Sequence, residues 1–306
     1  MSPAFLPRRI REYESWIRGL ANRLVDGFAK AGKTDIVSSY AARIPTAVVG
    51  KIVGAPEEDS RQFAHWVDDI FTLTGDWDVP EAEQASAWRG VFAFEDYIAA
   101  LIADRRRNPQ DDLTTDFILA RADDGEPAMS DTEVLWNVFN VAAAGSDTTG
   151  VLIAQALHLL LAHRSEWDAI REDRSLIPNA VDEAMRLRAP VRALIRRTTA
   201  QAIIGGVTIP ADSLVLISVA STGHDEQIFP HPERFDVRRG NAKRHLGFGS
   251  RIHSCIGAPL ARLEAQIAIE TLIDRLPDLR MSEQSRSLIY RPNLILPVID
   301  HLHVHW

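Results

Sequence analysis

Apolar residues recur at helical spacing through the first third of the chain. The pattern predicts four helices in succession, over residues 10–28, 36–53, 57–74 and 81–104. Pro45 is expected to mark a boundary or a kink in the second helix, because proline lacks the N–H group that a helix interior needs. Residues 74–80 include Gly75 and Pro80 and are typical of a loop, so they separate the last two helices.

The third and fourth predicted helices carry a set of aromatic side chains. Aromatic residues at helical spacing are most often core residues, and we expect these to pack between the helices. They are Trp66, Phe71, Trp88, Phe92, Phe94 and Tyr97.

The rest of the chain alternates between helices and short strands. Ser130 and Glu133 have the spacing of a capping box, which predicts the start of the longest helix, over residues 134–163. Shorter helices are predicted over residues 113–120 and 176–187. Apolar or alternating runs predict strands over 195–200, 203–209, 214–219 and 294–306. The pattern therefore predicts a mainly α fold with a smaller β-rich part.

The middle of the longest predicted helix, residues 144–150, breaks the apolar pattern. It holds two glycines, one acid and two threonines: Gly145, Asp147, Thr148, Thr149 and Gly150. Such residues are poor helix formers, and a local conflict of this kind tends to mark a functional site. The alternative is an ordinary kink with a solvated face, since a threonine hydroxyl can bond to the carbonyl one turn earlier.

The single cysteine, Cys255, ends a glycine-containing loop and stands directly before an apolar helical pattern. The free N–H groups and the positive dipole at such a helix start favour a thiolate. A thiolate so placed can be a nucleophile, a redox sensor or one axial ligand of a metal. It cannot alone hold zinc or an iron–sulfur cluster, which need about four ligands. The alternative is a small buried hydrophobic residue.

Charge and composition exclude several classes of protein. The 306 residues carry a net charge of −8, and the longest basic run is three arginines, so we expect no nucleic-acid partner. One cysteine excludes an internal disulfide framework and fits a reducing cytoplasm. The first nine residues lack a signal-peptide core, and we find no apolar run as long as a membrane span. These features favour a soluble cytoplasmic enzyme with no membrane partner.

The loop that contains the motif Phe248-Gly249…His253-x-Cys255-x-Gly257 resembles the heme-binding loop of the cytochrome P450 family, the heme-thiolate monooxygenases. The resemblance implies that heme b is the cofactor and that Cys255 is the fifth ligand of its iron. It implies that Phe248 packs near the sulfur, and that Gly249 and Gly257 let the backbone approach the porphyrin. His253 matches a position that reaches a heme propionate.

Arg251 departs from this resemblance, because the family usually has glycine at that position. If the backbone there has positive φ, arginine is strained by about 1 kcal/mol.

The unusual stretch of the long helix matches the oxygen-activating helix of the same family. The resemblance implies that Gly145 opens a groove for dioxygen beside the heme. It implies that Asp147 and Thr148 form the catalytic acid–alcohol pair that delivers protons. The presence of this pair favours electron-driven activation of dioxygen over use of peroxide.

Further motifs follow the order of the family. Glu183 and Arg186 match its core-locking pair, whose implied third partner is Arg234. Arg196 stands where the family places a propionate-binding arginine, which suits a carboxylate through paired hydrogen bonds. Residues 191–194 are expected to line the pocket. Candidate substrate contacts on the third helix and the loop after it are Phe71, Leu73 and Trp77.

The start of the chain, residues 2–10, resembles a segment that the family carries just after its third helix. We therefore expect residues 1–306 to form a single, partial cytochrome P450 domain, without the usual N-terminal strands and first helices.

The resemblance implies a monooxygenase that inserts one oxygen atom from dioxygen into a small apolar organic substrate. Electrons would come from a ferredoxin- or flavodoxin-type partner, with NAD(P)H used only indirectly, and we expect a monomer. An inactive heme-binding remnant and a heme sensor of the same fold are the alternatives. At the C-terminus, His301, His303 and His305 alternate and could bind a metal, although solvated histidines are the more common outcome.

Overall fold

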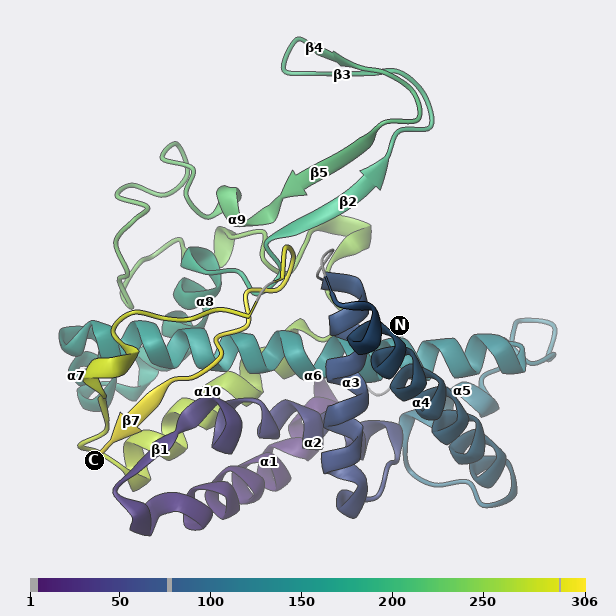
Figure 1. Ribbon diagram of the computed structural model, residues 1–306, viewed down its shortest axis with the longest axis horizontal. Coiled ribbons are helices and arrows are strands. Elements are labelled where there is room, and N and C mark those ends of the chain that lie inside the picture. Colours follow the sequence, from purple (N-terminus) through teal and green to yellow (C-terminus); the bar gives the residue numbers. More distant parts are fainter. Residues whose placement is uncertain (1–4, 76–78, 292) are drawn as a thin grey trace.

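A single long helix, α6 (Asp131–Ala162), runs through the middle of the molecule, and other helices pack against it (Figure 1). The computed structural model describes residues 5–75, 79–291 and 293–306. The capping box predicted for the start of α6 is present, since Ser130 Oγ accepts from the Glu133 N–H at 3.3 Å and the Glu133 carboxylate accepts from the Ser130 N–H at 2.8 Å. This helix therefore begins where its capping residues place it.

In the described part of the chain, α6 is preceded by the α-helices α1 (Pro7–Phe28), α2 (Arg43–Val53), α3 (Ser60–Gly75), α4 (Glu81–Arg107) and α5 (Leu113–Leu119). A π-helical turn, Val37–Ala41, leads into α2 just before the predicted boundary at Pro45. Buried Phe94 of α4 packs against Phe63 and Trp66 of α3, with ring centroids 5.0 and 5.4 Å apart. Trp88 and Phe92 are instead about half exposed, so the expectation of core packing was wrong for these two residues.

Among the described residues after α6 the α-helices are α7 (Arg164–Glu172), α8 (Ile177–Leu187), α9 (Val219–Thr222) and α10 (Ala258–Arg275). The helix α10 packs against α1, α6 and α8. No described helix combines the length and the apolar character that crossing a bilayer requires.

Three small antiparallel sheets complete the described fold. β2 (Ala193–Arg197) pairs with β5 (Leu214–Ser218), and β3 (Ala202–Ile204) pairs with β4 (Val207–Ile209). These strands extend away from the helices (Figure 1). In the third sheet β7 (His303–His305) lies between β1 (Lys33–Asp35) and β6 (Arg280–Met281). The fold is mainly helical with a smaller β part, as the sequence predicts, although α7 and the short strand β1 were missed.

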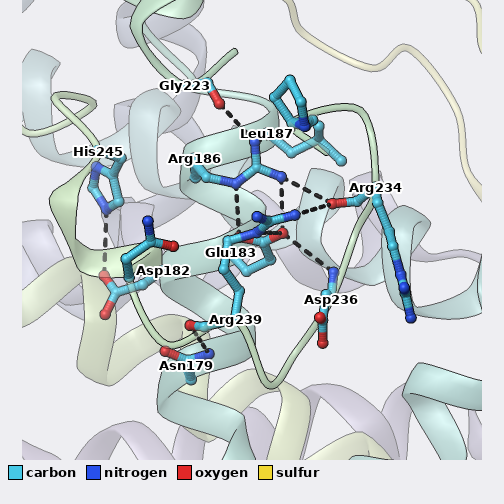
Figure 2. Close-up of polar contacts among 12 residues, drawn as sticks. Asn179, Asp182, Glu183, Arg186, Leu187, Gly223, Arg234, Asp236, Arg239 and His245 are labelled. Atoms are coloured by element: carbon cyan, nitrogen blue, oxygen red, sulfur yellow. Dashed lines mark hydrogen bonds and ion pairs between the residues drawn. The ribbon is translucent and has the colours of Figure 1, made fainter. Parts of the chain in front are cut away.

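A buried ionic network joins α8 to the long loop between α9 and α10 (Figure 2). The side chains of Glu183 and Arg186 have no exposed area, and Arg186 Nε lies 2.7 Å from Glu183 Oε2. All five N–H groups of Arg186 have acceptors: both Glu183 oxygens and the carbonyls of Gly223, Pro232 and Arg234. A buried ion pair needs such full satisfaction, because each charge has lost its water.

The third side chain of this network is Arg239, and the expectation that Arg234 fills this place was wrong. Arg239 Nε lies 2.9 Å from Glu183 Oε1. Arg234 contributes only its backbone carbonyl, which accepts from Arg186 and Arg239 at 3.0 Å each. Figure 2 shows both guanidinium groups beside the carboxylate of Glu183.

A second set of contacts ties α8 to the loop that carries Cys255. Asp182, next to Glu183, accepts from Arg262 Nε at 2.7 Å and lies 3.4 Å from His245 Nε2. Burial would raise the pKa of Asp182, but the hydrogen bonds from His245 and Arg262 outweigh burial and lower it. His245 Nδ1 accepts from the N–H of Gly247 at 3.0 Å, so the imidazole carries its proton on Nε2 and donates to Asp182.

Two residues of the cysteine loop have left-handed backbone. Gly249 has φ of 69°, and a Cβ there would lie 2.4 Å from the carbonyl oxygen of His253, so this position requires glycine. Arg251 has φ of 53°. The sequence-based expectation of strain at Arg251 is therefore confirmed, because a side chain with a Cβ is disfavoured in this conformation.

We predict that Arg251→Gly stabilises the protein. The replacement removes a left-handed strain of about 1 kcal/mol and loses no buried contact, since Arg251 is exposed. The free energy of unfolding, measured by urea denaturation, is expected to rise by about that amount. Arg251→Ala is the matched control, because alanine keeps the Cβ; equal stabilisation by alanine would contradict the account.

Candidate functional site

One cavity of about 460 Å³ lies between α6, α10 and the cysteine loop. Most of its walls are apolar, and its polar lining groups come from a few positions. From α6 and α2 the lining residues include Val49, Asn137, Asn140, Ala144, Gly145, Thr148 and Leu152. From the later parts of the chain they include Val191, Leu194, Val219, Phe248, His253, Cys255 and Glu264.

Seven of the nine predicted site residues line this one cavity. They are Gly145, Thr148, Phe248, Gly249, His253, Cys255 and Gly257. The cavity thus brings two stretches together that lie about a hundred positions apart in the sequence. Asp147 and Arg196 are not among its lining residues, and neither are Phe71 and Leu73, which pack against the core. Trp77 lies outside the described residues.

Cys255 presents an exposed thiol at the wall of the cavity. Its backbone N–H donates to the carbonyl of Phe248 at 2.8 Å, and its carbonyl accepts from the N–H of Ala258 at 3.3 Å. The cysteine is therefore held between its loop and the first residue of α10, where the sequence predicts it. The Phe248 ring lies against the guanidinium carbon of Arg262, 4.5 Å from the ring centroid.

Arg196 lies on the exposed end of β2 and does not reach the cavity. Its Nη1 donates to the backbone carbonyl of the preceding Ile195 at 2.9 Å. Along β2 the residues become more exposed after Ala193, and only Leu194 of this strand lines the cavity. The structure therefore does not place Arg196 beside the other predicted cofactor-binding residues.

α6 stays a continuous helix through residues 144–150. Thr148 Oγ1 donates to the carbonyl of Ala144 at 2.6 Å, which is the backbone contact foreseen for an ordinary helix threonine. The oxygen keeps its capacity to accept a hydrogen bond from the cavity side. A Cβ at Gly145 would lie 2.3 Å from Val49 Cγ2, so glycine here lets α2 approach α6 closely.

Asp147 lies near enough to Asp68 of α3 and to Arg291 for both charges to act on its carboxyl group. Burial and the neighbouring Asp68 carboxylate raise the pKa of Asp147 to about 7, and Arg291 opposes this effect. Arg291 also lies 3.6 Å from Asp68. Near neutral pH both the protonated and the ionised form of this carboxyl group are therefore populated, as a group that passes protons requires.

Glu264 of α10 is a polar lining residue that the sequence analysis missed. It is 2% exposed, its Oε2 has no hydrogen-bond partner among the described residues, and burial raises its pKa well above the usual 4.5. Its only sequence signal was an acid in an apolar helical pattern, where a charge is costly. The cavity therefore contains a carboxylic acid that holds its proton more tightly than an exposed glutamate does.

These residues fit a heme bound through Cys255. A porphyrin needs apolar walls, and the cavity lining includes Leu152, Val191 and Leu194. The exposed thiol of Cys255 could supply one ligand for the iron. His253 lines the same cavity and can meet a carboxylate.

The three C-terminal histidines do not form a metal site. His301 Nδ1 lies 3.0 Å from the Asp35 carboxylate, and its ring stacks on His303 at 5.5 Å. Within residues 5–75, 79–291 and 293–306, no group of three or more His, Cys, Asp or Glu side chains could hold a metal ion.

The chain is similar to known proteins along most of its length. The family model described as Cytochrome P450 matches residues 1–298. Cytochrome P450 CYP107DY1 of Priestia megaterium is 33% identical, over 97% of this chain and 72% of that protein. A steroid C26-monooxygenase of Mycobacterium tuberculosis is 33% identical, over 95% of this chain and 77% of that protein.

Solved structures show the same likeness. The structure of P450BioI in complex with an acyl carrier protein ligated to hexadec-9Z-enoic acid has a TM-score of 0.92 and 30% identity. The alignment covers 99% of this chain and 76% of the P450BioI chain. The family model matches nearly the whole chain, and the chain covers more than two thirds of relatives that are at least 30% identical to it. The chain therefore belongs to the cytochrome P450 family.

Proposed function

We propose that this chain is a heme-dependent monooxygenase that inserts one oxygen atom from dioxygen into a small apolar organic substrate. The observation that carries the proposal is that Cys255, Gly145 and Thr148 line one cavity. We propose a ferredoxin- or flavodoxin-type protein as the source of two electrons, in keeping with the bacterial relatives. A heme held by the Cys255 thiolate would supply the redox chemistry, because thiolate donation favours cleavage of the O–O bond.

The side chains of the cavity divide the remaining tasks. The apolar side chains of Val191 and Leu194 exclude water and orient an apolar substrate. Insertion of one oxygen atom consumes two protons and releases one water. Thr148 Oγ1 can hold a water in the cavity, and Asp147, one residue away on α6, can exchange protons between that region and solvent.

Glu264 is a second acidic group that we propose takes part in proton transfer in the same cavity. Its buried carboxylic acid lines the cavity from α10. Burial raises the pKa of Glu264 well above its usual value, so the group keeps its proton to a higher pH than an exposed glutamate does.

A heme-binding protein without turnover is the second candidate. Two observations favour it: Arg196 lies away from the cavity, and Arg251 has a strained backbone in the heme loop. A heme sensor would use the same ligand and would bind a gas without forming product.

The carbon monoxide spectrum of the heme-reconstituted, dithionite-reduced chain tests the ligand. We expect an absorption band at about 450 nm, the signature of thiolate ligation in this family. Cys255→Ser is the matched control and is expected to lose that band. If the wild type shows only a band at about 420 nm, or takes up no heme, the proposed function is contradicted. Consumption of reduced cofactor with product formation then separates the enzyme from the remnant and from the sensor.

We predict that two charge replacements move the pKa of Asp147 in opposite directions. Asp68→Asn removes a neighbouring negative charge and should lower this pKa below about 7, whereas Arg291→Gln removes a positive charge and should raise it. The pH titration of the Asp147 carboxyl group by carbon-13 NMR measures both shifts. Asp96→Asn, at an exposed position of α4, is the control and should leave the pKa unchanged. Shifts of the same sign in both variants would contradict the assignment.

A further inference from the structure

A second, open groove of about 810 Å³ lies at the C-terminal end of α6, away from the cysteine loop. Its lining comes from α6, the start of α7, the residue after α8, and the sheet formed by β6 and β7. The ionisable residues on it are Arg164, Arg188, Arg280, Arg286, His158, His163, His305 and one acid, Glu283. Thr148 and His158 are ten positions apart on α6, so the groove lies about 15 Å along the helix from the heme cavity.

Two of the four arginines have no carboxylate partner in the described part of the chain. Arg164 pairs with Asp168 at 3.2 Å, and Arg286 pairs with Glu283 at 3.0 Å. Arg188 instead donates to the hydroxyl of Tyr290 at 2.8 Å. Among the described residues no ion pair is formed by Arg280, which is exposed. The groove therefore carries about two uncompensated positive charges.

The sheet places further basic side chains at or beside the groove. In the antiparallel register His305 of β7 stands opposite Lys33 of β1 on one side and opposite Arg280 of β6 on the other. Residues directly opposite each other point to the same face of a sheet, so the Lys33 and Arg280 side chains lie on the face that His305 presents.

A buried imidazole without a partner faces the groove. His158 is 7% exposed, lines the groove, and its Nδ1 has no hydrogen-bond partner among the described residues. Burial, then the nearby charges of Arg188 and His163, lower its pKa to about 4. The imidazole is therefore neutral at physiological pH, and a ring nitrogen remains available to bind a ligand.

Arg164 and Arg188 do not serve as hydrogen-bonding caps for the C-terminal end of α6. The carbonyl of Leu159 already accepts from the backbone N–H of His163 at 3.0 Å and lies 2.9 Å from its Nδ1. Arg164 donates to the carbonyl of Leu279, outside α6, and Arg188 donates to Tyr290.

We propose that this groove is a binding site for a small phosphate-bearing ligand. Arg188 and Arg280 would meet the phosphate oxygens, since guanidinium groups bind them through paired hydrogen bonds. His158 and His305 would complete the polar contacts from α6 and β7. The site is separate from the heme cavity, and its existence does not depend on the proposed monooxygenase function.

Isothermal titration with inorganic pyrophosphate, at constant ionic strength set with chloride, tests the proposal on the purified chain. We expect saturable binding, and about a tenfold weaker affinity in each of Arg188→Gln and Arg280→Gln. Arg280→Lys keeps the charge and should lose less affinity than Arg280→Gln. Arg61→Gln, which removes an exposed arginine from α3, is the matched control and should bind as the wild type does.

The imidazole gives a second readout that does not depend on affinity. Because an anion stabilises a protonated histidine, pyrophosphate should raise the pKa of His158 above about 4, as followed by nitrogen-15 NMR. Absence of saturable binding would overturn the proposal. So would equal weakening by Arg61→Gln and Arg280→Gln, which is the behaviour of unspecific ion attraction, or a His158 titration that pyrophosphate leaves unchanged.

Discussion

The buried carboxylate of Glu183, held between the guanidinium groups of Arg186 and Arg239, is the interaction on which the cysteine site depends. It joins α8 to a loop with little regular structure of its own. Removing one partner of such a pair leaves an unpaired buried charge and costs about 3–5 kcal/mol. The network therefore fixes the path of the chain before it reaches the cysteine.

A short series of contacts connects this network to the backbone of Cys255. Asp182 stands next to Glu183 on α8 and binds His245 and Arg262, one on each side of the cysteine loop. His245 then fixes the N–H of Gly247, and Arg262 packs on the ring of Phe248, whose carbonyl holds the N–H of Cys255. Thus Glu183 orders the long loop that precedes the cysteine loop, and its neighbour Asp182 orders the cysteine loop itself.

Sequence periodicity predicted the long helices well, because each buries an apolar face along its own length. Cys255, Gly145 and Thr148 stood out because their residue types conflict with their surroundings and match family motifs, and the structure brings all three to one cavity. It could not identify Arg239 as the third partner of the network, because that contact joins positions 56 apart and depends on the loop path. The same limit explains β1, whose pairing partner lies at the other end of the chain.

The helix α6 connects the features of the molecule, since it lines the proposed heme cavity at its middle and the basic groove at its end. The central claim is that Cys255 presents its sulfur as the iron ligand. Iron K-edge X-ray absorption of the heme-reconstituted chain tests this claim directly. The account predicts one sulfur scatterer bound to iron in the wild type and none in Cys255→Ser. Iron coordinated only by nitrogen and oxygen in the wild type would contradict it.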